Sequence, residues 1–521
     1  MFALAGCVAV IKFKTSVGWS AFALVTALLA SVPMLQYAAG MIYFSGQAWT
    51  STAYLLGFLF SIQLGTQWEL NRPGQAMSAL LAAIGIAAVV SVGMQLYQWT
   101  GIAGFDIWIV PLWQNRPFAN LIQPNQMATL LLWALLALAW FIQKNRVGIP
   151  FALFVAGYLL FGLALTQSRM AIVAIALMAF AGWYWHKLWY SKRALRMGLS
   201  LLAFFVLSLL SIQPLSQALL LDPTFNAVNR IVSPDIRADA YAMFIDAIAQ
   251  QPMWGYGWTT LAPAHLALAE NHVSFGGVFQ QSHNLFLELI LWMGLPMGAL
   301  TGIFLLVWFM RQVRRVAQKE DALLVLFVGV AWWHAMLEFP LHYAYILFPV
   351  GLATGVLGIR INETMIFKSS RATLALGCVA AVALLGVMTR DYLRMEADFL
   401  ALRFERAYDM QQPAEVPETW VLSHLEAFIK LGRVVPHAGM THDELDWMRH
   451  TSEAFPSHSN LYTYVSALAM NGFTEQAQAK MRAMPKLMTP EDYQQLGRIW
   501  KTQSKTNPAL AATNWLSAPL Q

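Results

Sequence analysis

Four basic side chains near the middle of the chain have the types and spacing that group-transfer chemistry needs. A polar interval from about residue 212 to 281 interrupts long apolar runs and carries Arg230 and Arg237, and His283 follows it directly. Arg169 stands at the beginning of another apolar run. Arginine holds phosphate through paired hydrogen bonds, and histidine, with an ordinary pKa near 6.5, exchanges protons at neutral pH. These residues predict a site that binds a phosphate and moves a proton.

Each of these residues also has a purely structural interpretation. Arg169 could snorkel from a span to the membrane interface. Arg237 could form a solvated ion pair with Asp235 or Asp239, on an amphipathic helix that lies on the membrane. His283 could be an interfacial residue where a helix begins, with Ser282 as the helix cap. Because ionisable groups at membrane depth are costly, each remains a functional candidate as well.

Other polar side chains on the same predicted side of the membrane extend the candidate site. Glu338 is either a rival general base or the group that orients His283, and Tyr343 adds a phenol to the same turn. Amides and an arginine cluster where another span begins, in a pattern that suits sugar hydroxyls and phosphate. The candidate substrate-binding residues are therefore Arg116, Gln123, Asn125, Gln126, Arg230, Gln281, Asn284, Glu338 and Tyr343.

The elements that must position these residues are membrane spans. The 521 residues are 58% hydrophobic and 12% charged, whereas about a quarter of the residues of a soluble protein are charged. Apolar runs near the ~20 residues that cross a bilayer recur along the chain. We expect an all-α, polytopic membrane protein with about 11 spans, near 17–35, 48–66, 75–97, 124–143, 147–165, 169–187, 195–213, 283–308, 322–339, 342–359 and 372–389.

Lysine and arginine give these spans an orientation. They recur in alternate turns, which predicts that those turns face the cytoplasm, and the opposite side receives the loop at about 212–282 and everything after residue 389. In a bacterium this opposite side is the periplasm, and the membrane is the inner one. The same topology explains the pI near 9.2, because no basic stripe remains for nucleic acid. Cys7 and Cys378 lie in apolar segments, which excludes a disulfide framework and a zinc site.

The composition changes from apolar to mixed after residue 389. We therefore divide the chain into a membrane domain, 1–389, and a helical periplasmic domain, 390–521. Residues 461–484 have the small-and-aromatic rhythm of a tetratricopeptide-like hairpin, although such arrays need at least three repeats. This domain either caps the membrane part or docks a protein partner.

Three segments resemble the O-antigen ligase and polymerase superfamily of bacterial envelope glycosyltransferases. They are TQSR at 166–169, the Arg237 helix running into PMWGYGW at 252–258, and QSHNLF at 281–286 followed by GLP at 294–296. In that superfamily two arginines hold a lipid diphosphate and a histidine is the proposed base. Motif by motif, these roles fall on Arg169, Arg237 and His283.

Within the superfamily the chain looks most like the PglL/PilO-type protein O-oligosaccharyltransferases. This likeness rests on VPMLQY at 32–37, residues 53–58, RPFANLIQPNQ at 116–126, EFPLHYAY at 338–345, and RDY and RFE at 390–392 and 403–405. The chain departs from the branch at two positions, since the branch usually has His where Gln126 stands and often Trp where His342 stands.

The resemblance implies transfer of an oligosaccharide en bloc from undecaprenyl diphosphate to Ser or Thr hydroxyls of periplasmic proteins, with a pilin-like protein as acceptor. The arginines would stabilise the departing diphosphate, His283 would take the hydroxyl proton, and direct displacement would invert the anomeric carbon. We see no outward-facing carboxylate cluster suited to a divalent ion, so we expect a metal-independent reaction without a cofactor. The other expected partner is membrane lipid.

Three alternatives stay open. An O-antigen ligase or polymerase would share the donor and act on lipid A core or on glycan. A lipid-linked oligosaccharide transporter would need charges along its spans, whereas the ionisable residues here gather on one side. A non-catalytic envelope scaffold would use mainly the C-terminal helices.

Overall fold

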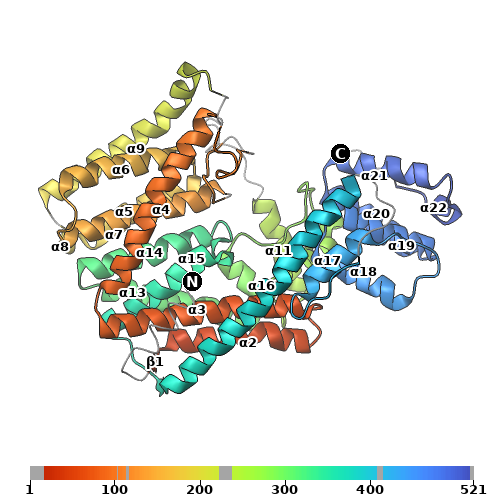
Figure 1. Ribbon diagram of the computed structural model, residues 1–521, viewed down its shortest axis with the longest axis horizontal. Helices are drawn as coiled ribbons and strands as arrows, with labels where there is room; N and C mark the ends of the chain where they lie inside the picture. Colours follow the sequence, from red (N-terminus) through yellow and green to blue (C-terminus); the bar gives the residue numbers. More distant parts are fainter. Residues whose placement is uncertain are drawn as a thin grey trace.

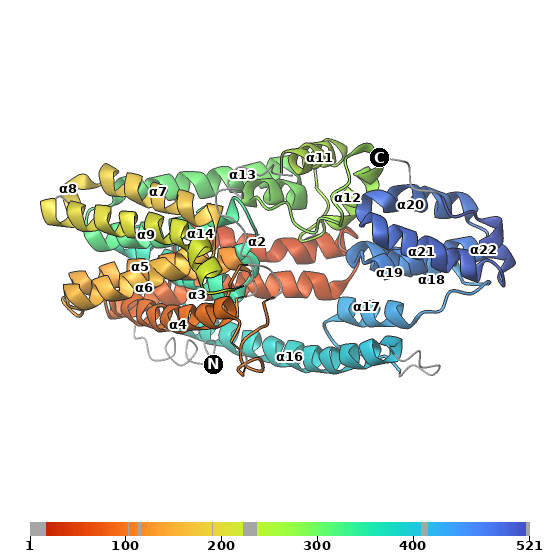
Figure 2. The same cartoon turned by 90° about the horizontal axis from the view of Figure 1, so that it is seen from above.

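The computed structural model describes residues 17–102, 104–112, 116–121, 123–189, 191–221, 237–407 and 415–516. Over these residues the protein is an elongated set of helices with one short two-stranded sheet (Figures 1 and 2). Its elements, in chain order, are β1 (Val17–Trp19), α2 (Ala21–Ala38), α3 (Ser45–Asn71), α4 (Gln75–Thr100), α5 (Pro124–Gln143), α6 (Ile149–Leu165), α7 (Arg169–Tyr184), α8 (His186–Trp189), α9 (Lys192–Ala218), α11 (Arg237–Gln250), α12 (Ala262–Leu268), η1 (Ala269–Asn271), α13 (Leu285–Arg315), α14 (Lys319–Ala335), η2 (Pro340–His342), α15 (Ala344–Arg360), β2 (Phe367–Ser369), α16 (Arg371–Ala407), α17 (Ser423–Arg433), α18 (His442–Ala454), α19 (His458–Met470), α20 (Thr474–Leu487), α21 (Pro490–Gln503) and α22 (Pro508–Ala512).

The expectation of an all-α membrane protein with several spans is confirmed. Every interval that we predicted as a span coincides with a helix, and six helices in the described part of the chain are long and apolar enough to cross a bilayer. These six are α2, α4, α5, α9, α13 and α16. The remaining intervals fall on helices α3, α6, α7, α14 and α15, so the full count of spans stays a prediction.

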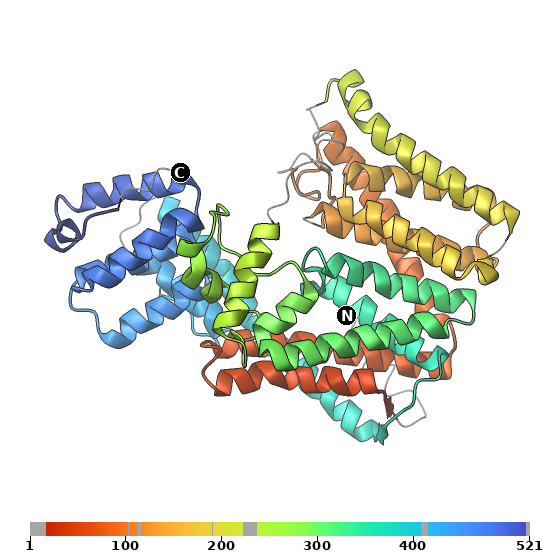
Figure 3. The same cartoon turned by 180° about the vertical axis from the view of Figure 1, so that it is seen from behind.

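The helices of the membrane part form two groups that meet at α14 and α15. Helices α4 to α9 make one group, and α2, α3 and α13 to α15 make the other (Figures 1 and 3). Helices α17 to α22 lie at one end of the molecule, with α17 beside α16, and α11 and α12 lie next to them (Figure 2). The short helices α11, α12 and α17 to α22 therefore form a layer next to the loops that carry the candidate site residues.

Helices α3 and α15 pack closely because glycines line their contact. A Cβ atom at Gly65 would meet the backbone of Leu352, and one at Gly355 would meet the backbone of Ile62. Gly351 lies one turn before Gly355, in the small-xxx-small spacing that lets two membrane helices approach. This contact fixes α15 against α3, and Glu338 lies in the segment that leads into α15.

A break in α13 anchors the segment at 252–258. Gly294 has φ 78°, inside a helix that otherwise continues from Leu285 to Arg315. At this break the amide of Leu295 donates to the carbonyl of Pro252 at 2.7 Å, and the amide of Tyr256 donates to that of Leu291 at 2.8 Å. A Cβ at Gly294 would collide with the backbone of Met253. Two of the motifs that carried the family resemblance thus contact each other and hold α11 against α13.

Two sequence expectations are wrong in detail. The apolar face of α11 is buried against α12 and α13 through Met243 and Phe244, each 1% exposed, so protein covers it instead of lipid. The helix cap at the head of α13 is Asn284, whose side chain accepts from the amides two and three residues ahead, and not Ser282.

The C-terminal region is a stack of short helices reached through α16. This helix runs without interruption through residue 390, the boundary that we drew between domains. Helices α19 and α20 form a hairpin over the segment at 461–484, with Gly472 (φ 82°) in the turn. Arg433 holds α17 against α16 through ion pairs with Asp398 at 2.6 Å and Glu405 at 2.8 Å. The likeness to tetratricopeptide repeats stays a prediction.

Candidate active site

Glu338 joins three of the residues that the sequence singled out. One carboxylate oxygen lies 2.8 Å from His283 Nδ1, and the other lies 3.4 Å from Arg237 Nη2 and 3.3 Å from Asn125 Nδ2. Arg237 Nη2 also donates to the carbonyl of Leu337 at 3.0 Å. Glu338 is 9% exposed. Residues from α5, α11, the head of α13 and the turn before α15 thus meet at one carboxylate.

His283 is held in an unusual backbone conformation. Its φ of 57° lies in the left-handed region, which residues other than glycine adopt rarely and at a cost. Asn284 fixes the next residue, because its side-chain amide donates to the carbonyl of Met336 at 3.3 Å while its oxygen caps α13. The imidazole also packs edge-on against Phe339, with ring centroids 5.2 Å apart. The backbone, the cap and the ring contact together set the direction of the imidazole.

Glu338 remains ionised near neutral pH. Burial alone would raise its pKa, but the hydrogen bond from His283 and the charges of His283 and Arg237 outweigh burial and hold the pKa below its ordinary value of 4.5. A carboxylate can only accept hydrogen bonds, so the proton of a neutral His283 lies on Nδ1. Its Nε2 then carries a lone pair, and no hydrogen bond reaches Nε2 from the residues that the structure describes. This arrangement suits a general base.

Arg169 is connected to the same cluster through its neighbour. Ser168 Oγ donates to Asn125 Oδ1 at 2.7 Å and accepts from the amide of Ala171, which caps α7. The turn before it is tight, because Gln167 has φ 46°. Arg169 is the first residue of α7. The polar chain from Ser168 through Asn125 to Glu338 therefore ties the position of Arg169 to that of His283.

Arg116 hydrogen-bonds to the turn that precedes Arg169. It is 7% exposed, and Nη1 donates to the carbonyl of Thr166 at 3.2 Å. Gln126 is buried inside α5 and accepts a hydrogen bond from the hydroxyl of Tyr345. Tyr343 stacks on Phe339 with ring centroids 6.1 Å apart. These residues brace the cluster, and none of them contacts Glu338 directly in the hydrogen bonds of the described chain.

The remaining predicted residues lie around the cluster. Gln123 is the residue before α5 and makes no side-chain cap. Gln281 lines a cavity next to Glu338. Arg230 lies outside the described residues. No group of three or more His, Cys, Asp or Glu side chains that could hold a metal ion occurs within the described ranges.

Sequence reasoning missed His265, which positions the loop before His283. His265 is 1% exposed, and its Nδ1 accepts the amide of Phe279 at 2.9 Å. Burial, with a smaller contribution from His272, lowers the pKa of His265 to about 4, so it stays neutral and keeps its acceptor. Nothing in the local pattern of α12 marks this residue, because its partner lies 14 positions away.

Comparisons with known proteins agree with the motifs. Residues 154–302 match the family described as O-antigen ligase, residues 117–141 match protein glycosylation ligase, and residues 322–502 match virulence factor membrane-bound polymerase, C-terminal. Each of the three matches contains part of the cluster around Glu338: the first includes His283, the second Asn125 and the third Glu338 itself.

Together, the multi-pass helical fold and these matches indicate the class of the protein, which is similar to membrane-bound oligosaccharyltransferases. The chain is 28% identical to the general O-oligosaccharyltransferase of Acinetobacter baylyi over 488 residues, which cover 89% of this chain and 84% of that protein. It is 27% identical to the ComP-specific O-oligosaccharyltransferase of the same organism over 353 residues, which cover 66% of this chain and 63% of that protein. The resemblance inferred from the motifs is confirmed.

Proposed function

We propose that the protein transfers an oligosaccharide en bloc from undecaprenyl diphosphate to Ser or Thr hydroxyls of periplasmic proteins, with pilin-like proteins as acceptors. The observation that carries this proposal is the shared contact of His283 and Arg237 with Glu338. A histidine, a type of side chain that can accept a proton, and an arginine, a type that can bind phosphate, thus share one carboxylate. The names of the two relatives support the reaction class.

In this reaction His283 Nε2 takes the proton of the acceptor hydroxyl as the hydroxyl oxygen attacks the anomeric carbon. A new carbon–oxygen bond forms, the bond to the diphosphate breaks, and its electron pair goes to the phosphate oxygen. Arg237 and Arg169 stabilise the charge that develops there. Glu338 stabilises the imidazolium that forms and holds the ring in place, as the carboxylate of a Ser-His-Asp triad does. Displacement from the opposite face inverts the anomeric carbon.

In the orientation that the lysines and arginines of the alternate turns predict, this site lies on the periplasmic face of the inner membrane. There the lipid tail of the donor stays in the bilayer while its diphosphate and glycan reach the cluster. Residues 1–389 act as the transferase domain, and residues 390–521 form a periplasmic domain beside it. Helices α17 to α22 lie at the same end of the molecule as α11 and α12 (Figure 2), where an acceptor protein would arrive.

A second candidate function is the transfer of glycan to lipid A core or its extension by polymerisation. The match of residues 154–302 to O-antigen ligase favours it, since that segment includes Arg169, Arg237 and His283. The same donor chemistry serves both functions, and only the acceptor differs. The match of residues 117–141 to protein glycosylation ligase weighs toward a protein acceptor.

Expression in a bacterium that makes a lipid-linked glycan and a pilin-like protein, but has no transferase of its own, tests the proposal. Intact-mass spectrometry of the envelope proteins should then show the glycan mass on the acceptor. The added mass should disappear with Arg237→Ala and with His283→Ala. Glycan on lipid A core with none on protein would instead support the second function.

A further inference from the structure

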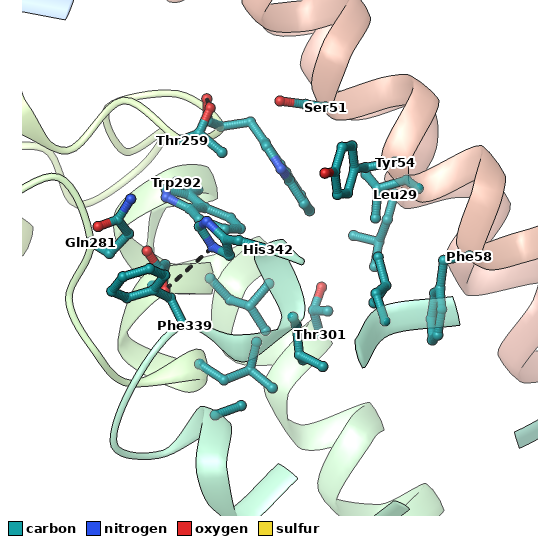
Figure 4. A pocket seen from close by; sticks show the side chains of 18 of the residues that line it. Leu29, Ser51, Tyr54, Phe58, Thr259, Gln281, Trp292, Thr301, Phe339 and His342 are labelled. Atoms are coloured by element: carbon teal, nitrogen blue, oxygen red, sulfur yellow. Dashed lines mark hydrogen bonds and ion pairs between the residues drawn. The ribbon is translucent and has the colours of Figure 1, made fainter. Parts of the chain in front are cut away.

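A cavity of about 460 Å³ adjoins the candidate active site, between α2 and α3 on one side and α13 on the other (Figure 4). Its volume falls within the ~300–1,000 Å³ of small-molecule sites. Apolar Phe58 lies toward one end of the cavity, and polar Ser51 and Thr259 lie toward the other (Figure 4). Glu338 lines the cavity as well, which connects it to the cluster.

The α13 wall of this cavity presents one hydrogen-bond acceptor and one donor without partners. Glu288 and Trp292 lie four residues apart, and therefore on the same face of the helix. They are 3% and 5% exposed, and both line the cavity. Glu288 Oε1 and Trp292 Nε1 have no hydrogen-bond partner among the described residues. Buried polar groups are nearly always paired, so these two atoms indicate a ligand that both donates and accepts.

Aromatic side chains face each other across the same space. Figure 4 shows Trp292 and His342 on one side of the cavity and Tyr54 and Leu29 on the other. His342 Nε2 lies 4.0 Å from Glu288 Oε2, which is the carboxyl oxygen other than the unpaired one. Trp258 adds a second indole, 4.8 Å from that of Trp292 between ring centroids.

We propose that this cavity binds a sugar ring of the donor glycan, an inference that rests on the proposed function. A sugar hydroxyl donates to Glu288 and another accepts from the indole N–H of Trp292, while its C–H faces contact Tyr54 and Trp292. A polyprenyl chain would leave both polar atoms unpaired. The cavity therefore selects the donor by its glycan.

The position of the cavity fits this role. Phe339 lines it and stands between it and the base, with its ring centroid 5.2 Å from that of His283 and 5.8 Å from that of His342. A sugar in the cavity is separated from His283 by about one aromatic ring. Gln281, two residues before the base, reaches the same space. Recognition of the glycan thus occurs beside the point where its anomeric carbon reacts.

Binding measurements on the purified full-length protein in nanodiscs test this assignment. The two ligands are the glycan-bearing undecaprenyl diphosphate donor and undecaprenyl diphosphate without sugar. The wild-type protein should bind the donor more tightly than the sugar-free lipid. Glu288→Gln and Trp292→Phe should each weaken donor binding about tenfold and leave the sugar-free lipid unaffected.

Trp308→Phe is the matched control, because its indole on the same helix already donates to Glu363 Oε1 at 2.8 Å. It should keep the wild-type preference for the donor. Variants that retain this preference would overturn the sugar site, and variants that lose affinity for both ligands equally would show that the cavity holds the lipid chain. Absence of glycan transfer by a wild-type protein that still prefers the donor would contradict the proposed function and leave the sugar site standing.

Discussion

Two charged clusters at opposite ends of α15 use the same kinds of side chain in different ways. At its C-terminal end Arg360 makes ion pairs with Asp321 at 2.6 Å and with Glu69 at 3.4 Å, and a hydrogen bond to Gln318 at 3.2 Å. The side chains of the arginine and the two acids are 16%, 5% and 3% exposed. Each acid also accepts a backbone amide, that of Gly74 for one and that of Gln318 for the other.

The cluster at the other end is more open. The side chains of His283 and Arg237 are 27% and 29% exposed, around a Glu338 side chain that is 10% exposed. The helix between the two clusters has 17 residues, or roughly 25 Å at 1.5 Å per residue. In the Arg360 cluster the charged groups are buried and paired with one another, so the cluster holds helices together. In the Glu338 cluster the arginine and the imidazole stay accessible to solvent, so they can act on a ligand.

The largest expected effect is on His283. His283→Gln removes the proton acceptor and keeps a side chain that can hydrogen-bond to Glu338. Loss of a general base lowers rates by about 10²–10⁴-fold, so initial rates of glycan transfer in purified membranes should fall by that factor. Unfolding temperatures of the variant and the wild type should agree within a few degrees, since the closed cluster at Arg360 is intact.

Arg360 provides the converse test. Arg360→Ala leaves two buried carboxylates without their cation, which costs about 3–5 kcal/mol of stability. The yield of folded protein and its denaturation midpoint should fall, while the rate per folded molecule stays near that of the wild type. A loss of transfer at full stability would mean that the closed cluster also takes part in the chemistry.

Arg237→Lys keeps the positive charge beside Glu338 but replaces the planar guanidinium group with an ammonium group. Lysine cannot reproduce paired hydrogen bonds to a diphosphate, so transfer should fall about 10²-fold. The Asp239→Asn variant, which changes a charge on the same helix, is the control. Equal rates for Arg237→Lys and wild type would contradict a role of the guanidinium in holding the leaving group.

Glu338→Gln should lower transfer by at least about tenfold, because the amide orients His283 without stabilising its charged form. It should also change the dependence of stability on pH. The folded pKa of Glu338 lies below its ordinary value of 4.5, so its ionised form stabilises the fold above pH ~4.5 and this contribution is lost as pH falls through the lowered pKa. Melting curves of the Gln variant below pH 5 should lack that part of the acid sensitivity.

The smallest effect belongs to His265. Its pKa is about 4 in the folded protein and ordinarily 6.5, so the unfolded chain takes up a proton first as pH falls. The contribution of neutral His265 to the stability of the fold is complete above pH ~6.5, and it declines as pH falls from there to ~4. His265→Asn should flatten this decline by a few degrees in unfolding temperature. An identical decline in the variant would assign the acid sensitivity to other groups.

Hydropathy predicted the helices of the membrane part well, because a span must be about 20 apolar residues long. The same signal could not tell what covers an apolar face. For α11 the spacing of Met243 and Phe244 suits lipid or protein equally, and only the packed structure shows that α12 and α13 cover it.

The types of the site residues were readable from the sequence, but their connections were not. The pair His283–Glu338 joins positions 55 residues apart, and Asn125 reaches Glu338 from 213 residues away. The unpaired atoms of Glu288 and Trp292 are likewise visible only after the helices pack. Separations of this kind depend on tertiary packing, which no local periodicity encodes.

The single-turnover rate of glycan transfer by purified His283→Ala, measured with and without added imidazole, tests the role of this residue most directly. If His283 is the base, the variant should transfer at least about 10²-fold more slowly than the wild type, and imidazole should restore part of the rate as the pH rises. Transfer by His283→Ala at the wild-type rate would contradict the proposed mechanism.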